Sequence, residues 1–369
     1  MERPIFKAPG APVEKLDTPA LVIDLDALDH NIETVHSFFR EQDAGLRPHV
    51  EAHRCPAIAS LQMESEGTVG GISVNTVGLA EHFANAGATD IFVANPIVTN
   101  LKIERLCRLA RRASITVYVD NIRNAEAISD VASSLGATPR AVVGVDTGLG
   151  VCGVEPGRAA VDLARAVDRL EALEFFGFAT YEGRISSEGP GQLADKSQDV
   201  ARMLVETGKM AGDAGLNVQV LSAGGTHNYE IMGAVPGITE VCAGAYALLD
   251  SRYAPLRPKL RPAARILATV TSRPEPGLAI TDTGQKAAGA DTGLAALDVG
   301  FNATLKSLSA EHGSLALLDD EAEKLRVGDH VWLIPSDIGT CANLFDYMHA
   351  VRDGRLETVW QITGRGLYR

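Results

Sequence analysis

Short apolar runs alternate with amphipathic stretches over the first two-thirds of the chain. The intervening stretches are rich in Ala and Leu at helical spacing, as in Arg158–Leu173 and Ser197–Ala214. Strands that are apolar throughout and separated by helices indicate a parallel sheet covered by helices. Repeated units of this kind over about 240 residues favour a closed (β/α)8 barrel, with a doubly wound open sheet as the alternative. The strand-like runs are Ala20–Ile23, Ile91–Ala94, Thr116–Val119, Ala141–Val145, Phe175–Ala179 and Val218–Ser222.

The pattern changes near Arg261. From Ile266–Thr271 onward the chain holds strand-like segments and glycine turns with little helical spacing. This predicts a β-rich C-terminal domain at residues 261–369 that follows an α/β barrel domain at residues 16–260. The first strand, within Leu16–Ile23, can pack with the C-terminal domain. Residues 1–15 include three prolines in the first dozen positions and predict a mobile N-terminal arm.

Charge and hydropathy narrow the class of protein. The net charge of -13 argues against a nucleic acid or an anionic membrane as partner. No apolar run approaches the roughly 18–20 residues that span a bilayer, and the N-terminus has no apolar signal region. The five cysteines are scattered without a Cys-x-x-Cys pair, which predicts a reducing, cytoplasmic compartment. We therefore expect a small-molecule substrate.

The segment Arg47–Pro56, which reads RPHVEAHRCP, is the most informative for chemistry. We expect it to form a strand that runs into a barrel mouth. Side chains alternate along a strand, so His49, Glu51 and His53 would share one face. Polar groups on one face of a barrel strand are costly unless they bind something, and barrel active sites lie at the carboxyl ends of strands. The alternative is a satisfied hydrogen-bond network without chemistry.

Several further segments, in this order along nearly the whole chain, carry a resemblance. They are LDTPALVIDLDALDHNI, RPHVEAHRCP, GLGVCGVEPG, TYEGRI, SAGGTHNYE, CAGAYALLDSRYA and IPSDIGTCANLFD. Together they resemble the D-threonine aldolase and D-serine dehydratase family. The resemblance implies an N-terminal barrel of the alanine racemase type with a C-terminal β domain. It also implies pyridoxal phosphate and a divalent metal acting on β-hydroxy-D-amino acids, in a homodimer.

The chain departs from the family pattern at the positions that carry this chemistry. Glu51 stands where the family has the lysine that forms the imine, and Arg54 stands at a second lysine. A carboxylate cannot form an imine, so pyridoxal phosphate is not expected as an internal aldimine. Arg184 replaces the histidine that follows Tyr181 in the family motif, and Asp337 stands at the first position of the metal pair. The phosphate loop, in which His227 replaces a glycine, corresponds to Gly224, Gly225, Thr226, His227, Asn228 and Tyr229.

The replacements are themselves metal ligands, acids, bases or carboxylate clamps. One interpretation is a divalent metal held by a nitrogen and oxygen donor set of Glu51, His53, His227 and Asp337. In another, Glu51 or His53 is the general base, Arg54 and Arg184 hold a carboxylate, and Tyr181 lies beside them. We expect a lyase or epimerase for a small hydroxylated carboxylic or amino acid, working by retro-aldol cleavage, dehydration or epimerisation. The alternatives are a lyase with non-covalent pyridoxal phosphate and a non-catalytic ligand-binding protein.

Overall fold

The computed structural model describes residues 7–183 and 190–369, and these residues form two compact units. One, the strand unit, comprises the chain up to Thr34, Ala52–Ile58 and Ala245–Arg365. The other, the barrel unit, comprises Val35–Glu51, Ala59–Gly244 and Gly366–Arg369. The division is interleaved along the sequence and does not follow a single boundary at residue 260.

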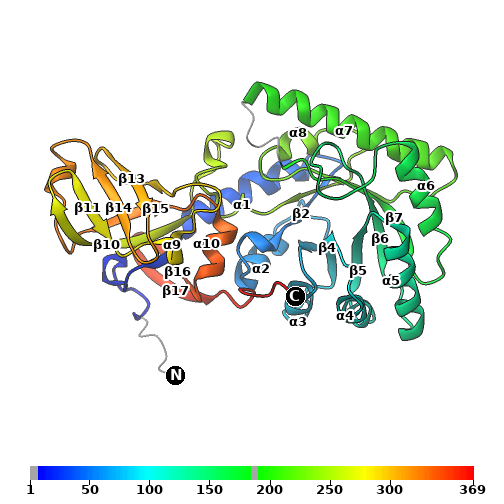
Figure 1. Ribbon diagram of the computed structural model, residues 1–369, viewed down its shortest axis with the longest axis horizontal. Coiled ribbons are helices and arrows are strands. Elements are labelled where there is room, and N and C mark those ends of the chain that lie inside the picture. The colour runs from blue at the N-terminus through cyan, green and yellow to red at the C-terminus, as the bar shows by residue number, and fades with distance from the viewer. Residues whose placement is uncertain (1–6, 184–189) are drawn as a thin grey trace. The chain divides into compact units, whose positions relative to one another are not determined.

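The barrel unit contains an eight-stranded sheet in which every neighbouring pair is parallel, in the order β2-β9-β8-β7-β6-β5-β4-β3. Its neighbouring strands β4, β5, β6 and β7 are labelled in Figure 1. Isolated parallel bridges from Leu46 to Thr68 and from His49 to Ser73 bring β2 back toward β3 and nearly close the sheet. The predicted eight-stranded barrel is therefore confirmed. Its strands are β2 (Gly45–Pro48), β3 (Ile72–Val74), β4 (Asp90–Pro96), β5 (Ser114–Val119), β6 (Arg140–Gly144), β7 (Glu174–Ala179), β8 (Val220–Ala223) and β9 (Glu240–Ala243).

Helices follow the strands of the barrel unit, as the alternating pattern predicts. Their ends carry local signals: the side chain of Asn121 accepts a hydrogen bond from the Arg123 N–H at the start of α5, and Gly136 ends that helix at φ +62°. These helices are α3 (Val77–Asn85), α4 (Asn100–Ala110), α5 (Ile122–Leu135), α6 (Arg158–Val167), α7 (Pro190–Asp213) and α8 (Tyr229–Gly233). Two further helices, α1 (Leu25–Arg40) and α2 (Pro56–Glu64), pass from the strand unit into the barrel unit.

The barrel interior is packed with large side chains. Phe92, Tyr118, Val142 and Ala179 form one buried cluster, each from a different strand. A Cβ on Gly144 would lie 1.9 Å from the Tyr118 ring, so this position accepts only glycine. The barrel interior beside β5 and β6 is therefore filled by side chains and is not an open channel.

A buried ion-pair network lies at the amino ends of the barrel strands. The Arg47 guanidinium lies 2.9 Å from Glu240 and 2.6 Å from Asp90, and Arg140 lies 2.6 Å from the other oxygen of Asp90. Burial opposes the charge of Arg47, but the carboxylates of Glu240 and Asp90 outweigh it and raise the Arg47 pKa. Asp90, Arg140 and Glu240 are the first residues of their strands. The network is at the end opposite the usual catalytic end of a barrel.

The strand unit contains a nine-stranded sheet in the order β13-β14-β11-β10-β1-β16-β17, with β15 pairing both β10 and β12. The first strand, β1, lies antiparallel to β10 and parallel to β16, so it belongs to this unit. The predicted β-rich C-terminal part is thereby confirmed. The strands are β1 (Ala20–Asp24), β10 (Ala264–Glu275), β11 (Leu278–Thr281), β12 (Ala296–Leu297), β13 (Ala303–Leu308), β14 (Gly313–Leu317), β15 (His330–Ile334), β16 (Tyr347–Arg352) and β17 (Arg355–Gln361), with short helices α9 (Gln285–Ala288) and α10 (Ile338–Leu344).

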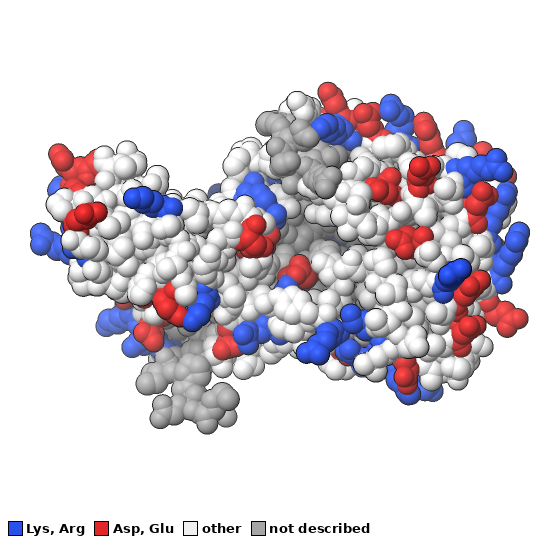
Figure 2. Space-filling model, viewed as in Figure 1, with Lys and Arg blue, Asp and Glu red and all other residues white. Residues whose placement is uncertain are grey.

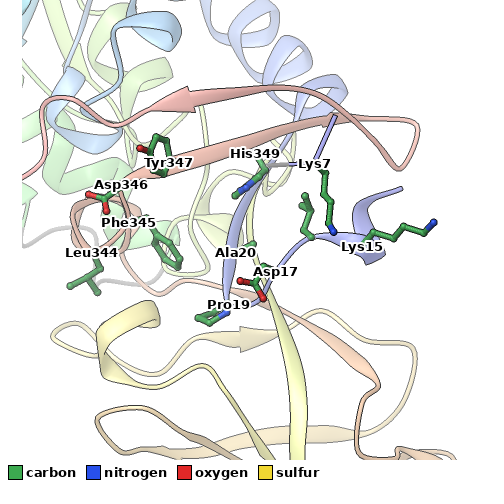
Figure 3. A pocket seen from close by; sticks show the side chains of 11 residues that line it. Lys7, Lys15, Asp17, Pro19, Ala20, Leu344, Phe345, Asp346, Tyr347 and His349 are labelled. Atoms are coloured by element: carbon green, nitrogen blue, oxygen red, sulfur yellow. The ribbon is translucent and has the colours of Figure 1, made fainter. Parts of the chain in front are cut away.

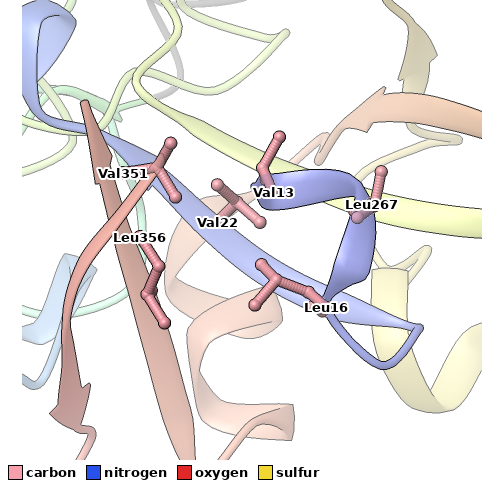
Figure 4. Packing of buried hydrophobic residues seen from close by; sticks show 7 residues of the cluster. Val13, Leu16, Val22, Leu267, Val351 and Leu356 are labelled. Atoms are coloured by element: carbon pink, nitrogen blue, oxygen red, sulfur yellow. The ribbon is translucent and has the colours of Figure 1, made fainter. Parts of the chain in front are cut away.

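The segment before β1 is attached to the β16–β17 hairpin. The Gly10 N–H donates to the Leu356 carbonyl at 2.7 Å, and the Leu356 N–H donates to the Ala11 carbonyl at 2.9 Å. Buried apolar side chains from both segments pack together (Figure 4). This cluster consists of Val13, Leu16, Ala20, Val22, Leu267, Val351 and Leu356. Part of the expected N-terminal arm is therefore hydrogen-bonded to the sheet.

The described surface shows no basic patch that would suit a nucleic acid on the face in view, as the net charge of -13 predicts. Basic and acidic side chains are interspersed over the described part of the face that Figure 2 shows, with no continuous basic area on it. Within residues 7–183 and 190–369, no helix is long and apolar enough to cross a membrane.

Candidate active site

The segment Arg47–Pro56 does not form the expected continuous strand. β2 ends at Pro48, and Val50–Ala52 forms a single 3-10 turn, η2. The prediction that His49, Glu51 and His53 share one strand face is therefore wrong. The physical reason is that a turn rotates successive side chains instead of alternating them. Glu51, half-buried, lies in this turn at the carboxyl end of β2.

His53 and Arg54 belong to the strand unit, and both are buried. The Cys55 N–H donates to Nδ1 of His53 at 3.1 Å. A neutral imidazole whose Nδ1 accepts carries its proton on Nε2, so this arrangement does not suit a metal ligand. Arg54 adopts φ +53° and donates from Nη1 to Oδ1 of Asn343 at 2.5 Å. This contact ties Arg54 to the last turn of α10.

Asp337, also in the strand unit, is the N-cap of α10. Its Oδ1 accepts the Thr340 N–H at 2.8 Å, and its Oδ2 lies 2.9 Å from Nη2 of Arg252. Arg252 also lies 3.8 Å from Asp250, whose pKa burial raises to about 6 against the opposing effect of the Arg252 charge. The cation that Asp337 faces in this structure is therefore a guanidinium.

A buried polar cluster occupies the carboxyl ends of β7 and β8 in the barrel unit. Glu182 follows β7, and the loop Gly224–Asn228, hereafter the glycine loop, follows β8, its parallel neighbour. Oε1 of Glu182 accepts a hydrogen bond from Nδ2 of Asn228 at 2.6 Å and lies 3.7 Å from Nε2 of His227. Burial raises the pKa of Glu182 to about 7, although the hydrogen bonds from Asn228 and Gly224 act in the opposite direction. This is the catalytic end of a parallel barrel.

Glu182 was not among the residues that the sequence singled out. The available signal was its place in Tyr-Glu-Gly, directly after a buried strand of the barrel, where catalytic side chains gather. Its neighbours Tyr181 and Arg184 were predicted instead. Of these, Tyr181 is 49% exposed, with its ring centroid 6.2 Å from that of His227 in an edge-on arrangement. Arg184 lies outside the described residues.

The other residues of the expected phosphate loop are buried. Thr226, His227 and Asn228 are all buried in the barrel unit. Tyr229 begins α8 and packs edge-on against Phe38 of α1, with ring centroids 5.7 Å apart. The Tyr229 ring is therefore part of the core between α1 and α8.

The expected cofactors can be compared with these positions. Among the described residues, no group of three or more His, Cys, Asp or Glu side chains is placed to hold a metal ion. The N–H groups of Gly224 and Gly225 donate to Glu182 and Asn228, whereas a phosphate cradle needs such groups for its ligand. Residue 51 offers a carboxylate and no amine. These residues as arranged do not fit either cofactor, and we derive no step through one.

A surface pocket of about 640 Å³ lies elsewhere, on the strand unit (Figure 3). It is open to solvent and lies along β1 and β16. Its polar lining includes Lys7, Lys15, Asp17, Tyr347 and His349, and none of the candidate residues. Because no candidate residue lines it, this pocket takes no part in the chemistry described above.

Comparison with known proteins identifies the family. Residues 23–248 match the model of the alanine racemase N-terminal domain, and residues 263–351 match that of a putative serine dehydratase domain. A D-threonine aldolase of Arthrobacter sp is 32% identical over 98% of this chain and 96% of its own length. A 3-hydroxy-D-aspartate aldolase of Paracoccus denitrificans is 32% identical over 97% of this chain and 94% of its own.

Solved structures agree with the sequence relatives. The crystal structure of D-threonine aldolase from Filomicrobium marinum superposes with a TM-score of 0.93 at 32% identity, covering 98% of this chain and 100% of that one. D-threo-3-hydroxyaspartate dehydratase from Delftia sp. HT23 has a TM-score of 0.84 at 26% identity, covering 95% and 98%. These matches confirm the resemblance seen in the sequence. The chain belongs to the family of D-threonine aldolase and 3-hydroxy-D-aspartate aldolase, with the alanine racemase-like fold.

Proposed function

We propose that this protein is a lyase for a small hydroxylated amino or carboxylic acid and that it works without an imine at residue 51. The relatives named above are aldolases and a dehydratase, which are lyases of hydroxy amino acids. Retro-aldol cleavage and dehydration both require a proton acceptor and a proton donor beside the bond that breaks. On the family resemblance, Glu51 stands at the position of the imine lysine.

One observation carries the proposal: the buried cluster of Glu182, His227 and Asn228 at the carboxyl ends of β7 and β8. A carboxyl group and an imidazole 3.7 Å apart lie within ion-pair distance, and a closer approach when substrate binds would let a proton pass between them. The Asn228 amide, 2.6 Å from the carboxyl group, fixes its orientation. In this proposal Glu182 and His227 take the proton of the substrate hydroxyl as the carbon–carbon bond breaks. The electron pair of that bond passes to the α-carbon and its carboxyl group, and the proton then returns to the α-carbon. The partly exposed Tyr181 lies beside His227.

The expected metal is not part of this proposal, because the described residues do not form a donor cluster as they are arranged. The related dehydratase has a solved metal-free form, and metal binding by Glu51, His53, His227 and Asp337 is tested separately. The side chains of His53 and Asp337 already have the contacts described above. Metal analysis of the purified protein decides this question, with no change to the proposed role of Glu182.

The proposed function is tested by product analysis. Purified protein is incubated with D-threonine and with D-threo-3-hydroxyaspartate, and glycine plus aldehyde is distinguished from a keto acid plus ammonia. Turnover is expected to survive borohydride treatment, because no imine forms, and to fall at least about a hundredfold in Glu182→Gln. Glu206→Gln, on the exposed face of α7, is the matched control. Loss of activity on borohydride treatment would contradict the proposal, as would full activity of Glu182→Gln.

We further propose a homodimer. The strand unit is small, and a small β-rich unit gains a docking surface from a symmetric partner. The barrel unit also exposes apolar side chains on the loops that follow β4 and β6, with Val98 63% and Val151 75% exposed. Light scattering should give twice the chain mass of 39.0 kDa at micromolar concentration. A monomer mass would contradict this.

A further inference from the structure

The glycine loop is satisfied by side chains of its own unit. The Gly224 N–H donates to Oε2 of Glu182 at 3.4 Å, and the Gly225 N–H donates to Oδ1 of Asn228 at 3.0 Å. The Asn228 N–H donates to the Gly225 carbonyl at 3.2 Å. Backbone N–H groups in a glycine-rich loop bind phosphate when they point at a ligand. Here the first two N–H groups of the loop point at a carboxylate and a carboxamide of the same chain.

Glu182 is held firmly in this position. Glu182 is 3% exposed, and its Oε1 accepts a hydrogen bond from Nδ2 of Asn228 at 2.6 Å. The same Asn228 amide donates to Oγ of Ser197 on α7 at 3.0 Å. Ser197 and Asn228 are themselves fully buried. The chain therefore places a carboxyl group of its own where the loop would receive an anion, and Asn228, itself hydrogen-bonded to Ser197 on α7, holds that group in place.

His227 fills further space at the loop. Its side chain is fully buried, and a Cβ on Gly225 would lie 3.1 Å from the His227 ring. The imidazole therefore lies directly against the second glycine. The helix that follows, α8, has only five residues, Tyr229–Gly233, and so contributes little dipole toward an anion. The His227 ring and the short helix α8 therefore do not offset the effect of the Glu182 carboxyl group on a bound anion.

We propose that the glycine loop binds no phosphoryl group, because Glu182 and His227 occupy the place that a phosphate would take. The ligand of this end of the barrel is then an unphosphorylated compound. What that ligand undergoes rests on the proposed function, but the exclusion of phosphate is a statement about binding alone. A phosphate brought to the loop would have to displace the Glu182 carboxyl group from Gly224 and Asn228 and then lie beside it, and the charged form of that group opposes binding.

Two probes that differ only in the phosphate test this directly. Pyridoxine 5′-phosphate and pyridoxine carry no aldehyde, so neither forms an imine with surface lysines. Equilibrium dialysis at neutral pH gives the dissociation constant of each for the full-length wild-type protein. The two constants are expected to agree within about threefold, since the loop adds no affinity for the phosphate. A wild-type preference of about thirtyfold or more for the phosphorylated probe would overturn the proposal.

Variants test whether Glu182 and His227 close the loop. Glu182→Ala combined with His227→Gly should bind the phosphorylated probe at least about tenfold more tightly than wild type, with pyridoxine unchanged. Glu206→Ala is the control, and circular dichroism shows whether each variant is folded. If the double variant is unfolded, Glu182→Gln, which keeps the shape and removes the charge, should still shift the ratio toward the phosphorylated probe. A folded variant with an unchanged ratio would contradict the assignment, whatever the enzymatic activity proves to be.

Discussion

Asp337 forms an ion pair with Arg252, in which its Oδ2 lies 2.9 Å from the guanidinium. Its other oxygen caps α10 by accepting the Thr340 N–H. Asp337 therefore satisfies a backbone donor in the first turn of α10 and also neutralises the Arg252 guanidinium. On the family resemblance this is a position of the metal pair, and here a guanidinium supplies the positive charge. The two contacts indicate that Asp337 stabilises the fold.

The first prediction follows from these contacts. Asp337→Ala removes the cap and the ion pair and should lower the free energy of unfolding by about 1–2 kcal/mol. Asp337→Asn keeps an acceptor at the cap and should recover most of this loss. Urea titration measures both values. If Asp337 instead serves mainly as a metal ligand, the alanine variant should lose bound metal in elemental analysis while its metal-free form keeps wild-type stability.

Asp90 predicts a dependence of stability on pH. Burial alone would raise its pKa, but Arg47 and Arg140 outweigh this and hold the pKa below its ordinary value. A carboxyl group with a lowered pKa stabilises the fold above its ordinary pKa of about 3.9 and loses this contribution as the pH falls through the folded value. Asp90→Asn should cost about 2–3 kcal/mol at neutral pH. The difference from wild type should shrink below about pH 4, and a difference that stays constant between neutral pH and pH 3 would contradict this account.

The N-terminal segment gives a prediction about stability. Sequence composition alone suggests that residues 1–12 can be removed with little effect, but Gly10 and Ala11 exchange backbone hydrogen bonds with Leu356. Two such bonds contribute about 2 kcal/mol, or about 2–3 °C in a protein of this size, from an unfolding entropy of about 2.1 cal/mol/K per residue. A chain without residues 2–12 should therefore melt that far below one without residues 2–7. Equal melting temperatures in calorimetry would show that these hydrogen bonds contribute nothing.

The sequence predicts the barrel strands β4 to β8 because each is a short apolar run followed by a helix. It places the first strand with the C-terminal domain but does not predict that β1 pairs with β10, where Leu267 lies opposite Ala20. Pairing between segments so far apart in the chain leaves no periodic pattern in the sequence. The end of β2 at Pro48 was likewise missed, because alternating polar residues look the same in a strand and in the turn that follows. Glu182 was missed because its importance comes from burial beside Asn228, which only the folded chain shows.

The last prediction concerns Glu51, in the turn that follows β2. Glu51→Lys supplies the amine that an imine needs, at the position where the family resemblance expects one. If the barrel mouth differs from its relatives only at this residue, the variant should form a visible imine with pyridoxal phosphate and cleave D-threonine. We expect neither, because Glu182 and His227 still occupy the glycine loop and the phosphate has no site. Native turnover should fall as well, since a cation replaces a carboxylate there.

The combined variant separates these causes. Adding Glu182→Ala and His227→Gly to Glu51→Lys supplies the amine and opens the loop, so this chain should form the imine that the single variant does not. Glu51→Gln, which removes the charge without adding an amine, is the matched control and should form no imine in either background. Absorbance spectra before and after borohydride reduction, with mass spectrometry of residue 51, provide the readout. If Glu51→Lys alone binds pyridoxal phosphate covalently at residue 51 and cleaves D-threonine, the glycine loop accepts phosphate as it stands. Glu51 would then be the residue that separates this chain from a pyridoxal enzyme.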